Sequence, residues 1–232
     1  MTVTPDHVRQ AAAATRRALE PVVDADWSIP ARDLEWSVWD TGVHIADDQV
    51  FYATQLIAQP GDHQGYTPFE LTMWAKGARN EGMIRAIQVC AEILARVVAT
   101  AGPDDRGYHV YGVSDAEGFA AMGIVETLVH TYDMAVGLGV DWRPPGDVSI
   151  VVLERLFLEA PVGDPSQVLL WCTGREPLGD LPRRAEWRWD GTSAPDAPDS
   201  SDQSRRGVHA LGRTNRKGGS GQGGELAQRQ GA

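Results

Sequence analysis

Hydrophobic residues recur along most of the chain at spacings of three and four positions, which is the pattern of helices that bury one face. The first such run begins at Thr4-Pro5, because Thr is a favourable N-cap and Pro suits the first helical position. Pro21 is expected to end this helix. Its apolar face is marked by Val8, Ala12 and Leu19.

Two further helices are predicted on either side of a stretch that contains Pro60-Gly61. One extends from near Ser37 to about Ile57, and the other from about Arg79 to Thr100, where Gly102-Pro103 closes it. The positions expected to face inward are Trp39, Val43, Ala46 and Val50 in the former, and Ile84, Ile87, Ala91, Leu94 and Val98 in the latter.

The fourth predicted helix carries the clearest start signal of the chain. Ser114-Asp-Ala-Glu117 has the form of a capping box, in which the Ser and Glu side chains bind each other's backbone N–H groups. Either Gly137 or Gly139 is expected to terminate this helix. Its inward positions are Phe119, Met122, Val125 and Val129.

Shorter elements are predicted after the fourth helix. A fifth helix fits Val148 to Leu158, and a short one follows Asp164-Pro165 and ends by Gly174. Residues 185–190 alternate between apolar and polar side chains, which is compatible with a strand or with an extended cover over the core. The pattern as a whole predicts an all-α four-helix bundle followed by a short C-terminal helix and an extended segment.

The composition changes near residue 192, since no aromatic residue follows Trp189. We therefore divide the chain into a helical bundle domain, residues 1–192, and a Gly-, Ser- and Arg-rich tail, residues 193–232. The tail is expected to be disordered, because it holds too few apolar residues to offset the entropy lost on ordering.

The charge balance argues against several classes of partner. The 232 residues carry 21 Lys and Arg against 32 Asp and Glu, a formal charge of -11 that disfavours nucleic acid and anionic lipid surfaces. No apolar run is long enough to span a membrane, and the N-terminus lacks a signal-peptide pattern. The two cysteines, Cys90 and Cys172, are expected to be core thiols, so a cytoplasmic location is predicted.

Three side chains stand out as candidate metal ligands. Glu126 and His130 are four residues apart on the fourth predicted helix, so they share one face, and His44 lies among apolar residues of the second. Two histidines and a carboxylate form a three-ligand site for a divalent metal, with a fourth position left for water or substrate. Zinc suits these ligands, while iron, nickel or manganese remain alternatives. The simpler alternative is a hydrogen-bonded Glu126–His130 pair beside a core histidine.

Two segments that contain these residues resemble a known family. The segment Trp36-Ser-Val-Trp-Asp-Thr-Gly-Val-His44 and the segment Glu126-Thr-Leu-Val-His130-Thr-Tyr-Asp133 are similar to the N-terminal domain of mycothiol-dependent maleylpyruvate isomerases, in the DinB-like superfamily. The resemblance covers roughly residues 5–175. It implies an up-and-down bundle with one long crossover, and zinc bound by His44, Glu126 and His130.

The resemblance also implies a thiol cofactor, mycothiol, that adds to a small electrophilic substrate. The isomerase itself has a second, C-terminal domain, for which this chain offers only Trp187-Arg-Trp189 and the tail. The leading hypothesis is therefore a metal-dependent, thiol-using transferase or isomerase. A non-catalytic metal- or ligand-binding bundle and a zinc hydrolase are the alternatives, and apolar bundle faces leave a homodimer open.

Further residues are candidates for a role around the metal. Asp48 and Asp133 follow His44 and His130 by four and three residues, so either could accept the second ring N–H of a ligand histidine or be a solvated surface acid. His109 could line the mouth of the pocket, shuttle protons or simply pack between tyrosines. An anionic substrate would need a basic residue, for which the candidates are Arg79, Arg85 and Arg175.

Overall fold

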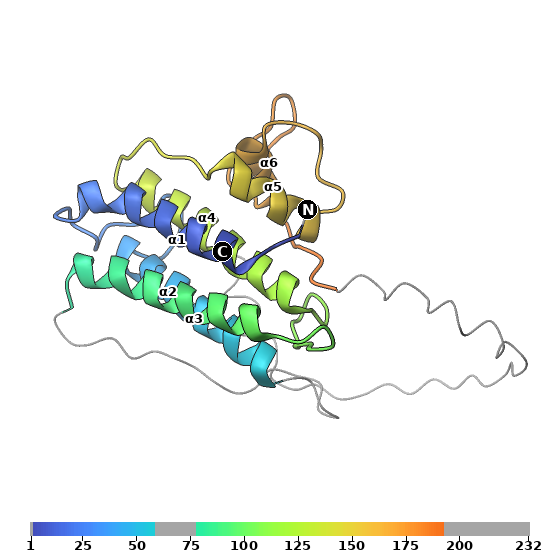
Figure 1. The fold of residues 1–232 in the computed structure, drawn as a ribbon. Helices are drawn as coiled ribbons and strands as arrows, with labels where there is room; N and C mark the ends of the chain where they lie inside the picture. Colours follow the sequence, from blue (N-terminus) through green and yellow to red (C-terminus); the bar gives the residue numbers. More distant parts are fainter. Residues whose placement is uncertain (1, 59–77, 193–232) are drawn as a thin grey trace, which may run out of the picture.

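The computed structural model describes residues 2–58 and 78–192 of the chain (Figure 1). Within these residues it contains six α-helices and one short 3-10 helix, and only isolated β-bridges rather than strands. The prediction of an all-α fold is therefore confirmed. The predicted disorder of residues 193–232, and the turn predicted at Pro60-Gly61, lie outside the described residues.

Four long helices form a bundle. They are α1 (Pro5–Leu19), α2 (Val38–Ala58), α3 (Asn80–Thr100) and α4 (Ala116–Gly137). Both α1 and α2 pack against α3 and against α4, so α1 and α2 occupy opposite corners of the bundle. The chain between them, which starts with the 3-10 helix Glu20–Val22, consequently crosses from one corner to the other. None of the helices in the described part of the chain is long and apolar enough to cross a membrane.

Two short helices, α5 (Gly146–Leu156) and α6 (Pro165–Cys172), complete the fold. Helix α5 packs against α4 and α6 packs against α5, on the side of α4 that faces away from α2 and α3 (Figure 1). Helix α4 is thereby enclosed, and every residue from Gly118 to Ala135 is buried. The sequence predicted one buried face for α4, but α5 covers the opposite face as well.

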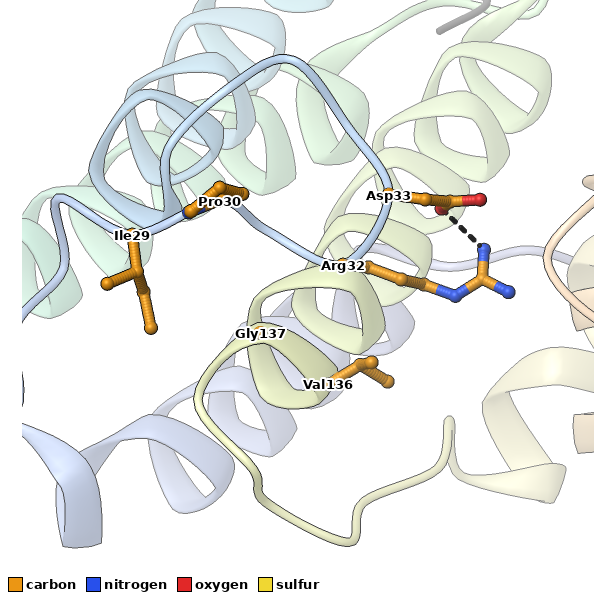
Figure 2. Close-up of a pocket in the computed structure, with 6 residues that line it drawn as sticks. All are labelled: Ile29, Pro30, Arg32, Asp33, Val136 and Gly137. Atoms are coloured by element: carbon orange, nitrogen blue, oxygen red, sulfur yellow. Dashed lines mark hydrogen bonds and ion pairs between the residues drawn. The ribbon is translucent and has the colours of Figure 1, made fainter.

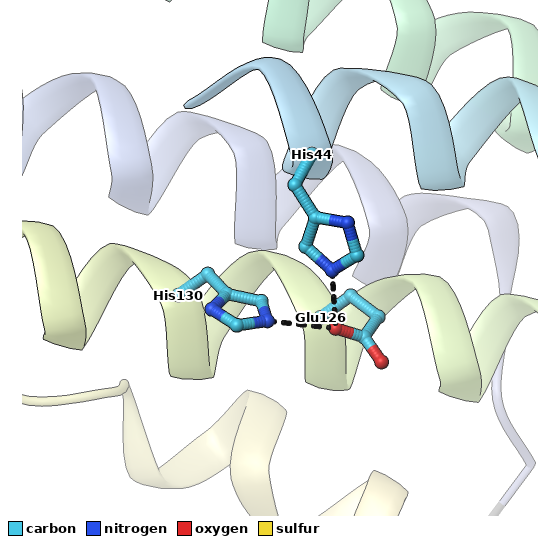
Figure 3. Close-up of side chains that lie close together, drawn as sticks. All are labelled: His44, Glu126 and His130. Carbon is cyan, nitrogen blue, oxygen red and sulfur yellow. Dashed lines mark ion pairs between the residues drawn. The ribbon is translucent and has the colours of Figure 1, made fainter. Parts of the chain in front are cut away.

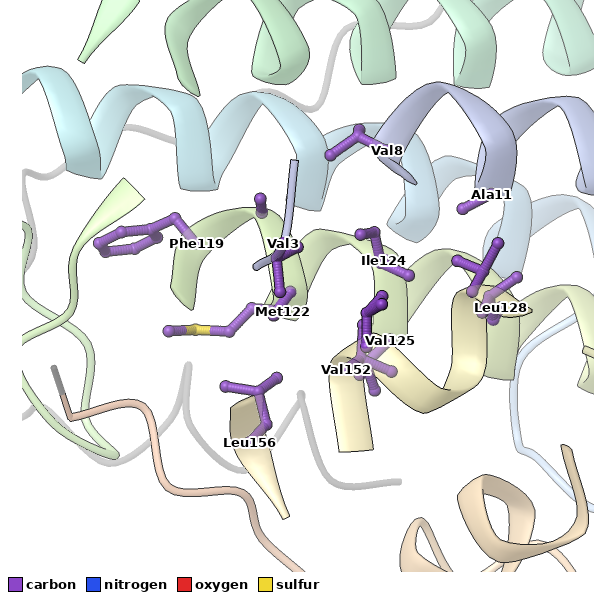
Figure 4. Packing of buried hydrophobic residues seen from close by; sticks show 14 of the residues in the cluster. Val3, Val8, Ala11, Phe119, Met122, Ile124, Val125, Leu128, Val152 and Leu156 are labelled. Atoms are coloured by element: carbon purple, nitrogen blue, oxygen red, sulfur yellow. The ribbon is translucent and has the colours of Figure 1, made fainter. Parts of the chain in front are cut away.

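The larger hydrophobic core surrounds α4. Figure 4 shows Val8 and Ala11 of α1 approaching α4 from one side, and Val152 and Leu156 of α5 approaching it from the other. All four side chains are at most 2% exposed. At about 25 cal/mol per Å² of apolar surface, burial of this kind is the main driving force for the bundle. Because α4 is at its centre, polar groups on α4 are withdrawn from water.

The helix starts predicted from Thr-Pro and Asp-Pro pairs are confirmed. Thr4 is the N-cap of α1, and its backbone N–H donates to Nδ1 of His7 at 3.1 Å. Asp164 is the N-cap of α6, and its carboxylate accepts from the backbone N–H of Gln167 at 3.0 Å. These caps satisfy N–H groups that have no partner within the helix.

The start of α4 lies one residue later than the predicted capping box. The N-cap is Asp115, whose carboxylate accepts from the backbone N–H of Gly118 at 2.8 Å and pairs with Arg155 at 3.0 Å. Ser114 instead exchanges two backbone hydrogen bonds with Gly107, at 2.8 and 2.9 Å. Because that bridge holds Ser114 outside the helix, the cap passes to the neighbouring acid.

The buried face predicted for α2 is wrong by about one position. Of the four residues expected to face inward only Ala46 is buried, whereas Ile45, Gln49 and Tyr52 are fully buried. The polar Gln49 belongs to the core face because its Nε2 donates to the carbonyl of Gly123 at 2.9 Å and to Oγ1 of Thr127 at 3.1 Å. The hydrophobic pattern did not identify this face, because Gln49 is polar and its hydrogen-bond partners lie on another helix.

Residues 185–190 form an extended cover and not a strand. The backbone N–H of Asp190 donates to the carbonyl of Leu156, and that of Gly191 donates to the carbonyl of Tyr111, both at 2.9 Å. Trp189 is 2% exposed and belongs to the larger core. This segment ties α5 to the loop that precedes α4.

Helix α6 ends in a Schellman motif around Gly174. The backbone N–H of Gly174 donates to the carbonyl of Trp171 at 3.0 Å, and that of Arg175 donates to the carbonyl of Leu170 at 2.7 Å. Gly174 has a φ of 68°, in the left-handed region that favours glycine. The motif reverses the chain and directs the next residue, Arg175, towards α4.

Replacing Gly174 with alanine should destabilise the protein by about 2 kcal/mol, because the left-handed backbone is strained and the added Cβ meets a carbonyl. That Cβ would lie 2.8 Å from the backbone oxygen of Arg184. Gly139 is the matched control, since its φ is 71° but an added Cβ meets nothing within 4 Å. Gly139→Ala should cost about 1 kcal/mol. Urea unfolding of both variants measures these costs. Equal losses in the free energy of unfolding would contradict a contribution from the contact with the Arg184 oxygen.

Candidate metal centre

Helices α2 and α4 bring His44, Glu126 and His130 together in the bundle interior (Figure 3). Glu126 and His130 project from one face of α4, and His44 reaches towards them from α2. One ligand atom from each side chain lies within 4.8 Å of the others. The sequence pattern placed the three on two helices, and the packing of α2 against α4 makes them neighbours.

Two of the three separations between these atoms are close to those in a metal coordination sphere. Nε2 of His130 lies 3.1 Å from Oε2 of Glu126, and Nε2 of His44 lies 3.5 Å from the same oxygen. A tetrahedral zinc ion with ligand distances of about 2.0–2.1 Å needs ligand atoms about 3.3 Å apart. The three residues could therefore hold such an ion with small adjustments.

Several polar atoms of this group are buried without a hydrogen bond. They include Nε2 of His44 and Oε1 of Glu126. The side chains of Glu126 and His130 are 3% and 4% exposed, and that of His44 is 14% exposed. Buried polar atoms without partners are costly, so Nε2 of His44 and Oε1 of Glu126 favour an occupant that both side chains can bind.

The ionisation of the pair on α4 is shifted in opposite directions. Burial disfavours the carboxylate of Glu126, but the rings of His130 and His44 outweigh it and hold the pKa of Glu126 well below its usual range. Burial also disfavours a charged His130, yet Asp133 and Glu126 raise the pKa of His130 above its ordinary value. A protonated His130 thus compensates the negative charge of Glu126 in the absence of a metal ion.

Asp48 lies at the same centre. Its Oδ2 is 3.2 Å from Nε2 of His44, the nitrogen that also faces Glu126, in a contact that lacks the geometry of a hydrogen bond. Burial raises the pKa of Asp48 to about 8; His44 opposes this shift and Glu126 adds to it. The structure therefore places Asp48 on the ligand side of His44, and not at the opposite ring nitrogen where the sequence hypothesis put it.

Asp133 lies behind His130. Its Oδ2 is 3.2 Å from Nδ1 of His130, which is the ring nitrogen turned away from Glu126. Arg175 contacts the same carboxylate, with Nη2 2.9 Å from Oδ2. Burial raises the pKa of Asp133, but the charge of Arg175 and the contact with His130 lower it overall. The sequence suggested Arg175 as a candidate to bind an anionic substrate. In the structure its guanidinium is buried and paired with Asp133.

The structure does not bring His109 to this centre. The His109 ring is 1% exposed and packs against Tyr111 and Trp189, with ring centroids 5.3 and 5.6 Å away. Its contact on α2 is Tyr52, about two helical turns beyond His44. This placement corresponds to the packing alternative and leaves the hypothesis of a pocket mouth or proton shuttle without support.

Trp36 is a neighbour of the centre that the sequence analysis did not assign to it. Its ring centroid lies 4.8 Å from that of His44 and 6.1 Å from that of His130. Trp36 is only partly buried, and His44 is the most exposed of the three candidate ligands. The side of the centre nearest the surface, within the described residues, is therefore that of His44 and Trp36. A single tryptophan before a helix does not by itself indicate that its ring will lie beside a candidate metal ligand.

A separate surface depression of about 610 Å³ lies near the C-terminal end of α4 (Figure 2). Arg32 and Asp33 border it and form an ion pair at 2.9 Å. None of the candidate metal ligands lines this depression. The lining residues are Ile29, Pro30, Arg32, Asp33, Val136 and Gly137.

Fold and site together define a helical bundle that could hold a metal ion between two of its helices. The family model described as the mycothiol maleylpyruvate isomerase N-terminal domain matches residues 8–135, more than half of the chain. The chain belongs to this family, which is part of the DinB-like superfamily. The matched region contains His44, Glu126 and His130, but α5, α6 and Arg175 lie beyond it. Comparisons with curated proteins and with solved structures found no match.

The raised pKa of His130 predicts how the stability of the metal-free protein depends on pH. Such a histidine stabilises the fold below its unfolded-state pKa of 6.5, and the contribution is lost as pH rises through the folded-state pKa. Chelator-treated protein should therefore melt at a lower temperature at about pH 9 than at about pH 6.

The variant His130→Asn isolates this effect, because Asp48, with its raised pKa, also favours the fold at lower pH. The pH dependence should be smaller in His130→Asn than in the parent protein. Thermal melts over this pH range measure it. A dependence that survives in His130→Asn would contradict the assignment.

Proposed function

We propose that the chain binds a divalent metal ion, zinc in the first instance, through His44, Glu126 and His130, and uses it with mycothiol as a thiol cofactor. The reaction would be transfer of the thiol to a small electrophile, or an isomerisation through such an adduct. The observation that carries this proposal is the convergence of one ligand atom from each of the three side chains, within 4.8 Å of one another in the protein interior.

The donor set supports the choice of metal. Two imidazoles and one carboxylate are the ligands of many zinc sites that retain an open fourth position. When bound, the ion would lower the pKa of a thiol so that the nucleophilic thiolate exists near neutral pH. The family's name supports mycothiol as that thiol and maleylpyruvate isomerisation as a related reaction.

The surrounding residues have distinct roles in this proposal. Glu126 supplies the negative charge of the ligand set, and its lowered pKa keeps it ionised at neutral pH. Asp133 lies 3.2 Å from Nδ1 of His130 and would hold that nitrogen, which would leave Nε2 of the ring for the metal. Trp36 forms a wall on the open side, where a thiol and an electrophile would enter. The proposed location is the reducing cytoplasm, where a free thiol persists.

The first test is metal content. Purified full-length protein should contain close to one equivalent of metal by elemental analysis, because three ligands converge on one point. His44→Ala, Glu126→Gln and His130→Ala should each weaken zinc affinity by a factor of about 100 or more, since each removes a donor. Asp48→Asn should weaken it less, because Asp48 contacts only His44 within the group.

His7→Asn is the control for these titrations, since His7 caps α1 and lies outside the group. Competition with a chromophoric chelator measures the affinities, and circular dichroism checks that each variant is folded. Zinc affinity that is unchanged in both His44→Ala and His130→Ala would exclude the site.

The second test separates catalysis from binding. Metal-loaded protein is incubated with mycothiol and a chloronitroarene or maleylpyruvate, and the conjugate or isomer is followed by chromatography. Turnover should require both metal and thiol, and should fall at least 100-fold in His130→Ala, because the thiolate would no longer be stabilised. Hydrolysis without thiol would favour the zinc hydrolase, and stoichiometric metal without any turnover would favour the non-catalytic binding bundle.

A further inference from the structure

A chain of buried charged groups leads from the proposed metal centre into the segment after α6. Nδ1 of His130 lies 3.2 Å from Oδ2 of Asp133, and the same oxygen lies 2.9 Å from Nη2 of Arg175. Nε of Arg175 is 3.3 Å from both carboxylate oxygens, so the guanidinium engages Asp133 at two points. The three side chains are 4%, 0% and 5% exposed.

The backbone around Arg175 is held in place independently of Asp133. The Schellman motif at Gly174 fixes the direction of the chain, and Nη1 of Arg175 donates to the carbonyl of Thr173 at 2.8 Å. Arg32, from the loop before α2, donates to the backbone carbonyl of Arg175. Arg175 is thus a preorganised group that presents a fixed pair of donors to α4.

Asp133 depends on this arginine. A buried carboxylate with a single imidazole partner could rotate and so lose its hold on His130. The two-point contact with Arg175 fixes the plane of the carboxylate. Groups that hold the outer nitrogen of a ligand histidine set the orientation of its ring, and removing them typically weakens metal binding 10- to 100-fold.

From this geometry we infer that Arg175 is a positioning residue for the proposed metal centre and acts through Asp133 on the ring of His130. The inference rests on the proposed metal site. It extends that site to the segment after α6, which lies beyond the residues matched by the family model. The bundle helices α1 to α4 therefore supply the ligands, and the C-terminal segment supplies the group that keeps one ligand oriented.

The test measures cobalt and zinc affinity of full-length Arg175→Gln, Arg175→Lys and the parent protein. Arg175→Gln removes the charge and the two-point contact, so affinity should fall about 10- to 100-fold. Arg175→Lys keeps the positive charge but can make only a single contact with the carboxylate, so metal affinity should fall less in this variant. The visible absorption of bound Co²⁺ should also change in Arg175→Gln, because the ligand ring is no longer fixed.

Arg143→Gln is the matched control. Arg143 pairs with Glu176, the residue next to Arg175, at 2.8 Å and on the surface. Its loss loosens the same segment without touching Asp133. Metal affinity should remain within twofold of the parent, even if the melting temperature falls. A structural role alone would move melting temperature in both variants and metal affinity in neither.

The outcomes are distinguishable. Parent-like affinity and Co²⁺ spectrum in Arg175→Gln overturn the inference while leaving the metal site intact. If Arg175→Gln does not fold, Arg175→Lys decides, and parent-like affinity there overturns the inference. A parent protein that binds neither metal overturns the proposed site and this inference together. The inference is supported if metal affinity falls from the parent to Arg175→Lys and further to Arg175→Gln.

Discussion

The burial of Glu126 in the middle of α4 is the constraint on which the rest of the site depends. A carboxylate that is 3% exposed must be compensated, and in the described part of the chain its ion-pair partners are the rings of His130 and His44. Asp48 adds a second buried acid beside His44, whereas the buried Asp133 is paired with both His130 and Arg175. In the proposed function, a bound cation would compensate Glu126 and Asp48 together.

The enclosure of α4 explains why this constraint is strong. In a simple bundle one side of each helix faces water, whereas here α5 covers the outer side of α4. Among the described residues of the centre, His44 is the more exposed candidate ligand, beside the partly buried Trp36. The buried surroundings have a low dielectric, which strengthens interactions between charges. Both features suit the proposed use of a thiol.

The helices and two of their caps could be predicted from sequence because their causes are local. Thr4-Pro5 and Asp164-Pro165 satisfy or remove N–H groups within one turn, and the apolar spacing of α3 needs a single buried face. The predicted buried face of α2 and the predicted cap of α4 were wrong, because contacts with other segments determine both. Gln49 is buried on α2 because α4 offers it partners, and Asp115 caps α4 because a bridge to Gly107 withholds Ser114.

The sequence by itself determined which residues could share a helical face, so Glu126 and His130 were paired by their spacing. His44 joined them as a histidine among apolar residues of the second helix, and the family resemblance supported the set. Only the tertiary structure decided which partners those residues meet. It placed Asp48 on the ligand side of His44, His109 among aromatic rings, and Arg175 behind Asp133. The reason is physical: periodicity specifies a direction around one helix, whereas contacts between distant segments depend on how the helices cross and on which loop covers them.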